Sequence, residues 1–181
     1  MKLFIGCSSY NDIDSKYYKN VENLLEELFK RDNDLCFGAC DDGIMGVAYK
    51  TALKYKRDII GIYPNIYENY ADKLESKKIP VKTVGERTEK LINESDALIF
   101  LPGGYGTLYE LFTSIESKRG CEHNKPIIIY NSLGYFDKLL DFIDKMCSDG
   151  FAKEDVRNSY YVSDNTMDIV NYLNNYNNID G

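Results

Sequence analysis

Short apolar runs alternate with longer amphipathic stretches along almost the whole chain. The run at 97–101, Ala-Leu-Ile-Phe-Leu, contains no polar residue, whereas Val21, Leu24 and Leu28 recur at the spacing of one helix face. A strand without polar residues is buried on both faces, as in a parallel sheet that helices cover from both sides. The alternation therefore predicts an α/β fold with a mostly parallel sheet and helices on both faces.

The same pattern predicts where the individual elements lie. The segment at 65–78 is polar and rich in tyrosine, so we expect a loop with a short helix there, and we expect the asparagine-rich tail at 174–181 to fray. Strands are predicted at 3–7, 35–38, 58–63, 80–84, 97–101, 126–130 and 160–162. Helices are predicted at 15–31, 43–56, 86–94, 107–118, 135–147 and 166–176.

Length and charge limit the classes of function. A chain of 181 residues with no internal repeat and no Gly/Ser-rich linker is expected to form one domain over residues 1–181. Its formal net charge of −7 repels a phosphate backbone, so we expect no nucleic-acid partner. No apolar run approaches the roughly 18 residues of a membrane span, and the N-terminus lacks a signal-peptide pattern. We therefore expect a cytoplasmic protein with no membrane partner.

The chain has few residues that could bind a soft metal or act as a strong nucleophile. The chain has five cysteines and one histidine, His123. Cys36 and Cys40 have no second cysteine pair that would complete a zinc site, and His123 lies in a polar stretch predicted to be a solvated surface loop. We expect no metal site, thiols that stay reduced, and no histidine-dependent catalysis.

The segments that follow four of the predicted strands share glycine, hydroxyl side chains and one arginine. In open α/β sheets ligands bind beyond the carboxyl ends of the strands, so these segments are expected to line one crevice. Their composition is typical of a phosphate or nucleotide site. They are 6–9, 38–46, 85–87 and 102–107, and the third supplies Arg87.

The segment Pro102-Gly103-Gly104-Tyr105-Gly106-Thr107 carries the most information. Its glycines let a ligand approach the backbone, and the helix predicted to start near Thr107 points unpaired N–H groups and its positive dipole end into the loop. This arrangement predicts an anion pocket, to which Thr107 can add a hydroxyl. The loop is neither a Walker A motif nor a dinucleotide fingerprint, because no Gly-Lys-Ser/Thr and no Gly-x-Gly-x-x-Gly occurs there.

Each feature also has a purely structural alternative. Thr107 and Glu110 fit a capping box, with Thr107 at the N-cap and Glu110 at N3. Agreement among four strand ends favours the binding site over these alternatives taken together. The other features could serve helix packing, solvation or capping: the glycines of 43–46, Arg87, Ser8 and Ser9.

The residues from Pro102 to Glu110 match the pattern Pro-Gly-Gly-x-Gly-Thr-x-x-Glu. By this motif the chain resembles the LONELY GUY (LOG) family of phosphoribohydrolases, which are widely mislabelled as lysine decarboxylases. The segment 38–46 is similar to the family's Gly-Gly-Gly-x-x-Gly-Leu-Met-Gly loop, and 6–9 resembles its Cys-Gly-Ser-Ser opening. The likeness extends over residues 3–151.

The resemblance implies a Rossmann-like domain that forms a homodimer and needs no cofactor. It implies cleavage of the N-glycosidic bond of nucleoside 5′-monophosphates, AMP or cytokinin-type nucleotides, to free base and ribose 5-phosphate. It also implies that Arg87 and Glu110 are the catalytic pair, although of the family's Met-His-x-Arg-Lys segment only Arg87 remains. The residues expected to bind phosphate and ribose are Ser8, Ser9, Gly43, Met45, Gly46, Pro102, Gly103, Gly104, Tyr105, Gly106 and Thr107.

A nucleotide-binding sensor that keeps the phosphate pocket but lacks turnover is the alternative function. Lysine decarboxylation is not expected, because the chain has no large cofactor domain and no lysine that stands out as a Schiff-base partner for pyridoxal phosphate.

Overall fold

The computed structural model describes residues 1–177 and contains a seven-stranded sheet in the order β4-β3-β2-β1-β5-β6-β7. All neighbouring strands in it are parallel, which confirms the predicted Rossmann-like α/β fold. The strands are β1 (Lys2–Gly6), β2 (Asp34–Phe37), β3 (Ile59–Pro64), β4 (Lys77–Val81), β5 (Ala97–Phe100), β6 (Ile127–Tyr130) and β7 (Tyr161–Ser163).

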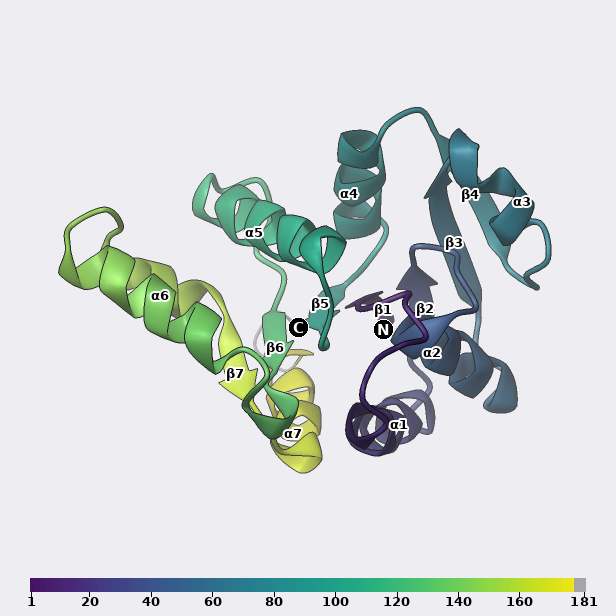
Figure 1. The fold of residues 1–181 in the computed structure, drawn as a ribbon, viewed down its shortest axis with the longest axis horizontal. Coiled ribbons are helices and arrows are strands. Elements are labelled where there is room, and N and C mark those ends of the chain that lie inside the picture. The colour runs from purple at the N-terminus through teal and green to yellow at the C-terminus, as the bar shows by residue number, and fades with distance from the viewer. Residues whose placement is uncertain (178–181) are drawn as a thin grey trace.

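Helices cover both faces of the sheet (Figure 1). One face carries α1 (Lys16–Phe29), α2 (Gly43–Lys54) and α7 (Thr166–Asn177), and the other carries α4 (Val84–Asn93), α5 (Tyr105–Arg119) and α6 (Asp137–Ser148). Successive strand residues alternate between the two cores: Leu3 and Ile5 pack toward α1 and α2, whereas Phe4 packs on the other face. Shorter elements are η1 (Asn65–Tyr67), α3 (Glu68–Ala71), η2 (Ser132–Gly134) and η3 (Glu154–Ser159).

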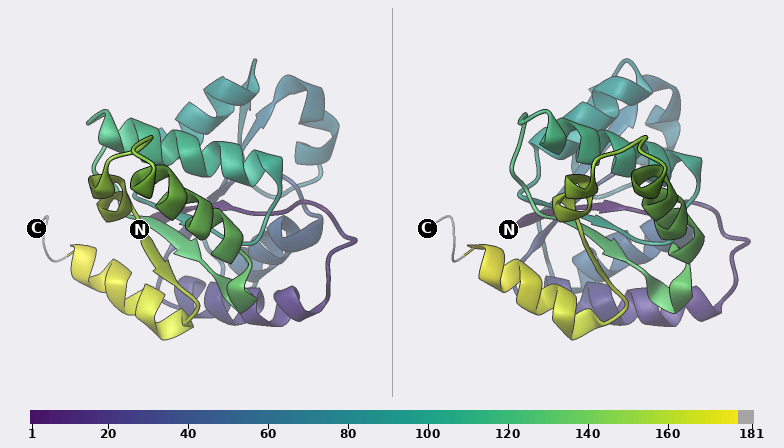
Figure 2. Two further views of the ribbon diagram at one scale, coloured as in Figure 1. Left: turned by 60° about the vertical axis from the view of Figure 1, so that its left-hand side comes forward. Right: turned by 90° about the vertical axis from the view of Figure 1, so that its left-hand side faces the viewer.

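The strand order reverses between β1 and β5. From β1 the chain proceeds outward to β4 and then crosses to β5 on the other side of β1. Figure 2 shows the loop after β1 projecting from the end of the sheet at which α5 begins. The two loops meet there, since the Ser8 N–H donates to the Pro102 carbonyl at 3.1 Å. A crevice at such a reversal is where doubly wound sheets bind ligands.

Two predicted boundaries are wrong in ways that matter for the site. The fourth strand was expected at 80–84 but is β4 (Lys77–Val81), an edge strand whose exposed Lys77 and Lys78 give no apolar signal. The fifth helix was expected from Thr107 but begins at Tyr105, with Gly104 at its N-cap. Glu110 therefore lies beyond N3, and the capping-box alternative is wrong.

The connecting segments agree with the sequence in part. The segment after β3 holds η1 and α3, in agreement with the expected short helix. His123 is half-buried rather than solvated: its Nδ1 accepts from the Lys125 N–H, so its Nε2 donates to the Ser114 carbonyl at 3.1 Å. Residues 178–181 of the expected frayed tail lie outside the described part of the chain. Among residues 1–177, no helix combines the length and apolarity needed to cross a bilayer.

Candidate active site

The start of α5 presents a row of unpaired backbone donors. Within residues 1–177, the N–H groups of Gly103 through Thr107 donate to no protein acceptor, and the first bond of the helix runs from Leu108 N to the Gly104 carbonyl. No side chain caps the helix. Unpaired N–H groups at the positive end of a helix dipole form an anion-binding site. A Cβ added to Gly104 or Gly106 would meet no heavy atom of residues 1–177 within 4 Å, so the backbone there is open to a ligand.

The preceding turn is tightly built. A Cβ on Gly103 would lie 2.1 Å from Thr107 Oγ1 and 3.0 Å from the Ser8 nitrogen, so only glycine fits between them. Ser8 is itself buried and accepts from Met45 N through its carbonyl, which ties the β1 loop to α2 as well. The structure thus brings Ser8, Pro102 and Gly103 together, whereas Ser9 is exposed and the Tyr105 side chain is 95% exposed.

A buried ion pair lies beside this loop. The Arg87 Nη2 donates to Glu110 Oε1 at 2.8 Å, and the two side chains are only 15% and 7% exposed. The other Glu110 oxygen, Oε2, lies 3.4 Å from where a Cβ of Gly6 would be, at the carboxyl end of β1. The two residues that the family resemblance selects are therefore in contact at the edge of the sheet where the β1 and β5 loops meet.

Burial dominates the electrostatics of Glu110. It raises the pKa of the Glu110 carboxyl from 4.5 to about 7, even though the charge and hydrogen bond of Arg87 lower it. A carboxyl with a pKa near neutrality can carry either the proton or the charge under physiological conditions, which is the property that acid–base catalysis uses.

Arg87 is held by the first turn of α4. Thr83 caps this helix by accepting from Glu86 N at 3.1 Å, and Glu86 Oε2 accepts from Lys82 N at 2.8 Å. Arg87 follows in this capped turn and points inward, where its Nη1 comes within 4.0 Å of a Cβ position on Gly38. Its Nε is buried and has no hydrogen-bond partner within residues 1–177. A buried guanidinium with an unsatisfied donor is costly unless a ligand supplies an acceptor.

The loop between β2 and α2 contributes shape more than donors. Gly43 has φ +58° and lies against the backbone of Tyr10, and its N–H donates to Asn11 Oδ1 at 2.8 Å. Gly46 packs on the Asp41 carbonyl. Met45 approaches the ion pair, since its thioether borders the same space beside Gly38 as Arg87 does.

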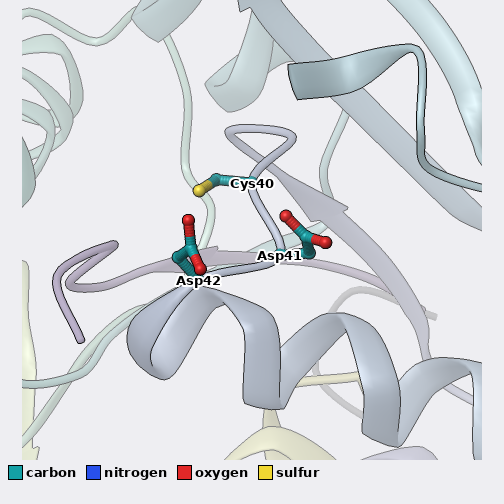
Figure 3. A group of neighbouring side chains, drawn as sticks. All are labelled: Cys40, Asp41 and Asp42. Carbon is teal, nitrogen blue, oxygen red and sulfur yellow. The ribbon is translucent and has the colours of Figure 1, made fainter. Parts of the chain in front are cut away.

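Figure 3 shows Cys40, Asp41 and Asp42 gathered above the first turn of α2. Their ligand atoms lie within 4.8 Å of one another, and all three side chains are partly exposed. Asp42 already accepts from Asn11 Nδ2, and burial raises the pKa of the Cys40 thiol, so the thiolate that a metal prefers is disfavoured. Burial and the charge of Glu110 likewise raise the pKa of the Cys7 thiol. Neither thiol is an activated nucleophile.

A cavity of about 200 Å³ adjoins the loop on the α1 side. Of the residues that line this cavity, the sequence predicted Ser8, Pro102, Gly103 and Gly104 as binding residues, but not the aromatic and aliphatic side chains of its walls. Those walls come from the β1–α1 loop, the starts of α1 and α2, and the segment after β6, which only the strand order brings together. The residues that were missed are Tyr10, Ile13, Tyr17, Ile44 and Tyr135.

Comparison with known proteins finds similarity over most of the chain. Residues 45–173 match the family described as "Possible lysine decarboxylase". The chain is 33% identical to the probable cytokinin riboside 5′-monophosphate phosphoribohydrolase LOG4 of Oryza sativa subsp. japonica, over 94% of this chain and 75% of that protein. It is 33% identical to the cytokinin riboside 5′-monophosphate phosphoribohydrolase LOG1 of Arabidopsis thaliana, over 96% of this chain and 82% of that protein.

A solved structure shares the fold at low identity. The molybdenum cofactor carrier protein of Chlamydomonas reinhardtii superposes with a TM-score of 0.71 at 16% identity, covering 96% of each chain. At that identity the likeness concerns the fold alone.

Proposed function

The chain belongs to the family described as possible lysine decarboxylases, which is the family of the LOG phosphoribohydrolases, and from this premise we propose that it hydrolyses nucleoside 5′-monophosphates to free base and ribose 5-phosphate. AMP and cytokinin-type nucleotides are the expected substrates. The curated relatives named above act, by their names, on cytokinin riboside 5′-monophosphates.

The observation that carries the proposal is the Arg87–Glu110 pair buried beside a row of unpaired amides. The amides of 103–107 bind the phosphate and so fix the sugar relative to the pair. Arg87 keeps an unsatisfied Nε that an oxygen of the nucleotide can satisfy.

The chemistry adds water across the bond between C1′ and the base. As the C1′–N bond breaks, its electron pair leaves with the base and positive charge develops on the sugar ring. The Glu110 carboxylate stabilises this charge and accepts a proton from the attacking water, whose oxygen bonds to C1′. The base takes up one proton and Glu110 releases the one it accepted, so the carboxylate is regenerated and atoms and charge balance.

Incubation of the purified protein with nucleoside monophosphates and the matching nucleosides tests the proposal. We expect chromatography to detect free base from AMP or another monophosphate, and little from the nucleosides, because the amides of 103–107 bind only the phosphorylated substrate. Equal affinity for AMP and adenosine by calorimetry would contradict a phosphate pocket. Tight binding of monophosphates with no base release would instead favour the nucleotide-binding sensor.

We further propose a homodimer formed through α4 and α5. The side of α5 that faces away from the sheet leaves Tyr105, Tyr109 and Phe112 exposed, and Val84 of α4 extends this apolar surface. Leu111 and Ile115 of the same helix are buried in the core, so one helix serves both core and partner. Apolar surface of this kind typically marks an interface.

Light scattering at micromolar concentration is expected to give twice the 20.8 kDa mass of one chain. Phe112→Glu places a charge in the proposed interface and is expected to shift the mass toward the monomer. Phe151→Glu, which alters an equally apolar residue exposed beyond α6, is the matched control and should leave the mass unchanged. A wild-type protein of single-chain mass would refute the dimer.

A further inference from the structure

Tyr135 reaches the anion-binding loop from a distant part of the chain. It follows η2, which comes after β6, and β6 lies next to β5 in the sheet. Its hydroxyl donates to the Gly103 carbonyl at 2.8 Å. Burial raises the pKa of this hydroxyl above its usual value, so it remains a donor.

The position of the Tyr135 ring is fixed by its surroundings. Gly134 precedes it at φ +68°, where a Cβ would also lie 2.4 Å from Asp137 Oδ2, so the turn requires glycine. Asn131 braces the turn by accepting from Phe136 N and donating to Asp137 Oδ1, both at 2.7 Å. The ring itself stands edge-on to Tyr17 at 5.6 Å and to Phe136 at 4.9 Å between centroids.

The bond to Gly103 fixes the direction of the next amide. The Gly103 carbonyl and the Gly104 N–H belong to one planar trans peptide, in which they point in opposite directions. The bond from Ser8 N to the Pro102 carbonyl fixes the Gly103 N–H in the same way. Without the Tyr135 hydroxyl, nothing else in residues 1–177 donates to the Gly103 carbonyl, and the peptide before the N-cap of α5 could rotate.

We propose that Tyr135 is a positioning residue that aims the Gly104 N–H at the phosphate of the bound nucleotide. The inference rests on the proposed function in taking the anion to be a sugar phosphate. Preorganised donors bind an anion more tightly because no loop ordering has to accompany binding. Tyr135 should therefore strengthen binding of the substrate and of the transition state equally, because the phosphate is bound in both.

Calorimetry with ribose 5-phosphate, which cannot be hydrolysed further, tests the proposal without requiring turnover. Tyr135→Phe keeps the ring and its edge contacts but removes the bond to Gly103, and we expect it to bind ribose 5-phosphate about five- to tenfold more weakly. Tyr172→Phe is the matched control, because Tyr172 lies on α7, its ring also packs against another tyrosine ring, that of Tyr161 on the edge strand β7, and its hydroxyl has no hydrogen-bond partner within residues 1–177. It should bind as the wild type does.

Kinetics provide a second readout. Tyr135→Phe should raise the KM for the monophosphate about five- to tenfold and leave kcat within about twofold, as expected for uniform binding. An unchanged affinity for ribose 5-phosphate in Tyr135→Phe, an equal loss in Tyr172→Phe, or a wild type that does not bind ribose 5-phosphate would overturn the inference. A weakened Tyr135→Phe in a protein that releases no base would support the positioning role and reject the hydrolase, so the two proposals fail separately.

Discussion

Glu110→Gln is expected to slow base release by about 10²-fold or more. Glutamine keeps the size of the side chain and can still accept the hydrogen bond from Arg87, but it removes the negative charge that would stabilise the sugar cation. Because each tenfold change in rate corresponds to about 1.4 kcal/mol of activation free energy, this decrease in rate is of the size expected when one preorganised electrostatic contact is removed. Affinity for the nucleotide should change far less, because the amides of 103–107 are untouched. Initial rates of base release and calorimetric affinities measure the two effects.

Glu116→Gln is the matched control for this variant. Glu116 lies on the same helix, is exposed, and pairs with Arg119 at the surface. It should release base at the wild-type rate. If Glu110→Gln also kept a near-normal rate with an unchanged melting temperature, Glu110 would have a structural role only, and another acid would have to serve the reaction.

Arg87→Met is expected to lower kcat/KM at pH 7 by about 10²-fold or more and to move the pH profile. The wild-type kcat/KM should fall tenfold per pH unit below about 7, because the ligand-free enzyme then loses the ionised form of Glu110. Arg87 lowers the pKa of Glu110, so removing it raises that pKa further and shifts the acidic limb to higher pH. The variant also loses the guanidinium donors that would bind the nucleotide.

The pH–rate profiles of wild type, Arg87→Met and Arg119→Met measure this shift. The substrate phosphate titrates near pH 6 with every variant, so the diagnostic is the movement of the limb between proteins. Arg119→Met removes an exposed arginine from the end of α5 and should leave the profile in place. A wild-type limb near pH 4.5, or a limb that does not move in Arg87→Met, would show that the ionisation of Glu110 does not control the rate.

Local patterns in the sequence were sufficient to predict the strands and long helices of the fold, though not all of their bounds. Strands such as β5 and helices such as α1 follow from runs and spacings that involve only neighbouring residues. The bounds of the edge strand β4 were predicted three residues too late, because its lysines face solvent and an exposed edge imposes no apolar pattern. The loop from Pro102 to Thr107 was also recognisable, since its glycines and the helix that follows are contiguous. Arg87 and Glu110, 23 positions apart, were selected by the resemblance to the LOG family and not by spacing.

The contacts of the candidate site residues were decided by the tertiary structure. Because α5 begins at Tyr105 rather than Thr107, Glu110 turns away from the helix end and meets Arg87. Its raised pKa comes from burial between elements, which no local pattern encodes. The contact of Tyr135 with Gly103 exists only because β6 lies beside β5. The periodicity of apolar residues indicates which face of a helix or strand is buried. Strand order and helix packing decide which residues that face contacts, and the electrostatics of this candidate site depend on those contacts.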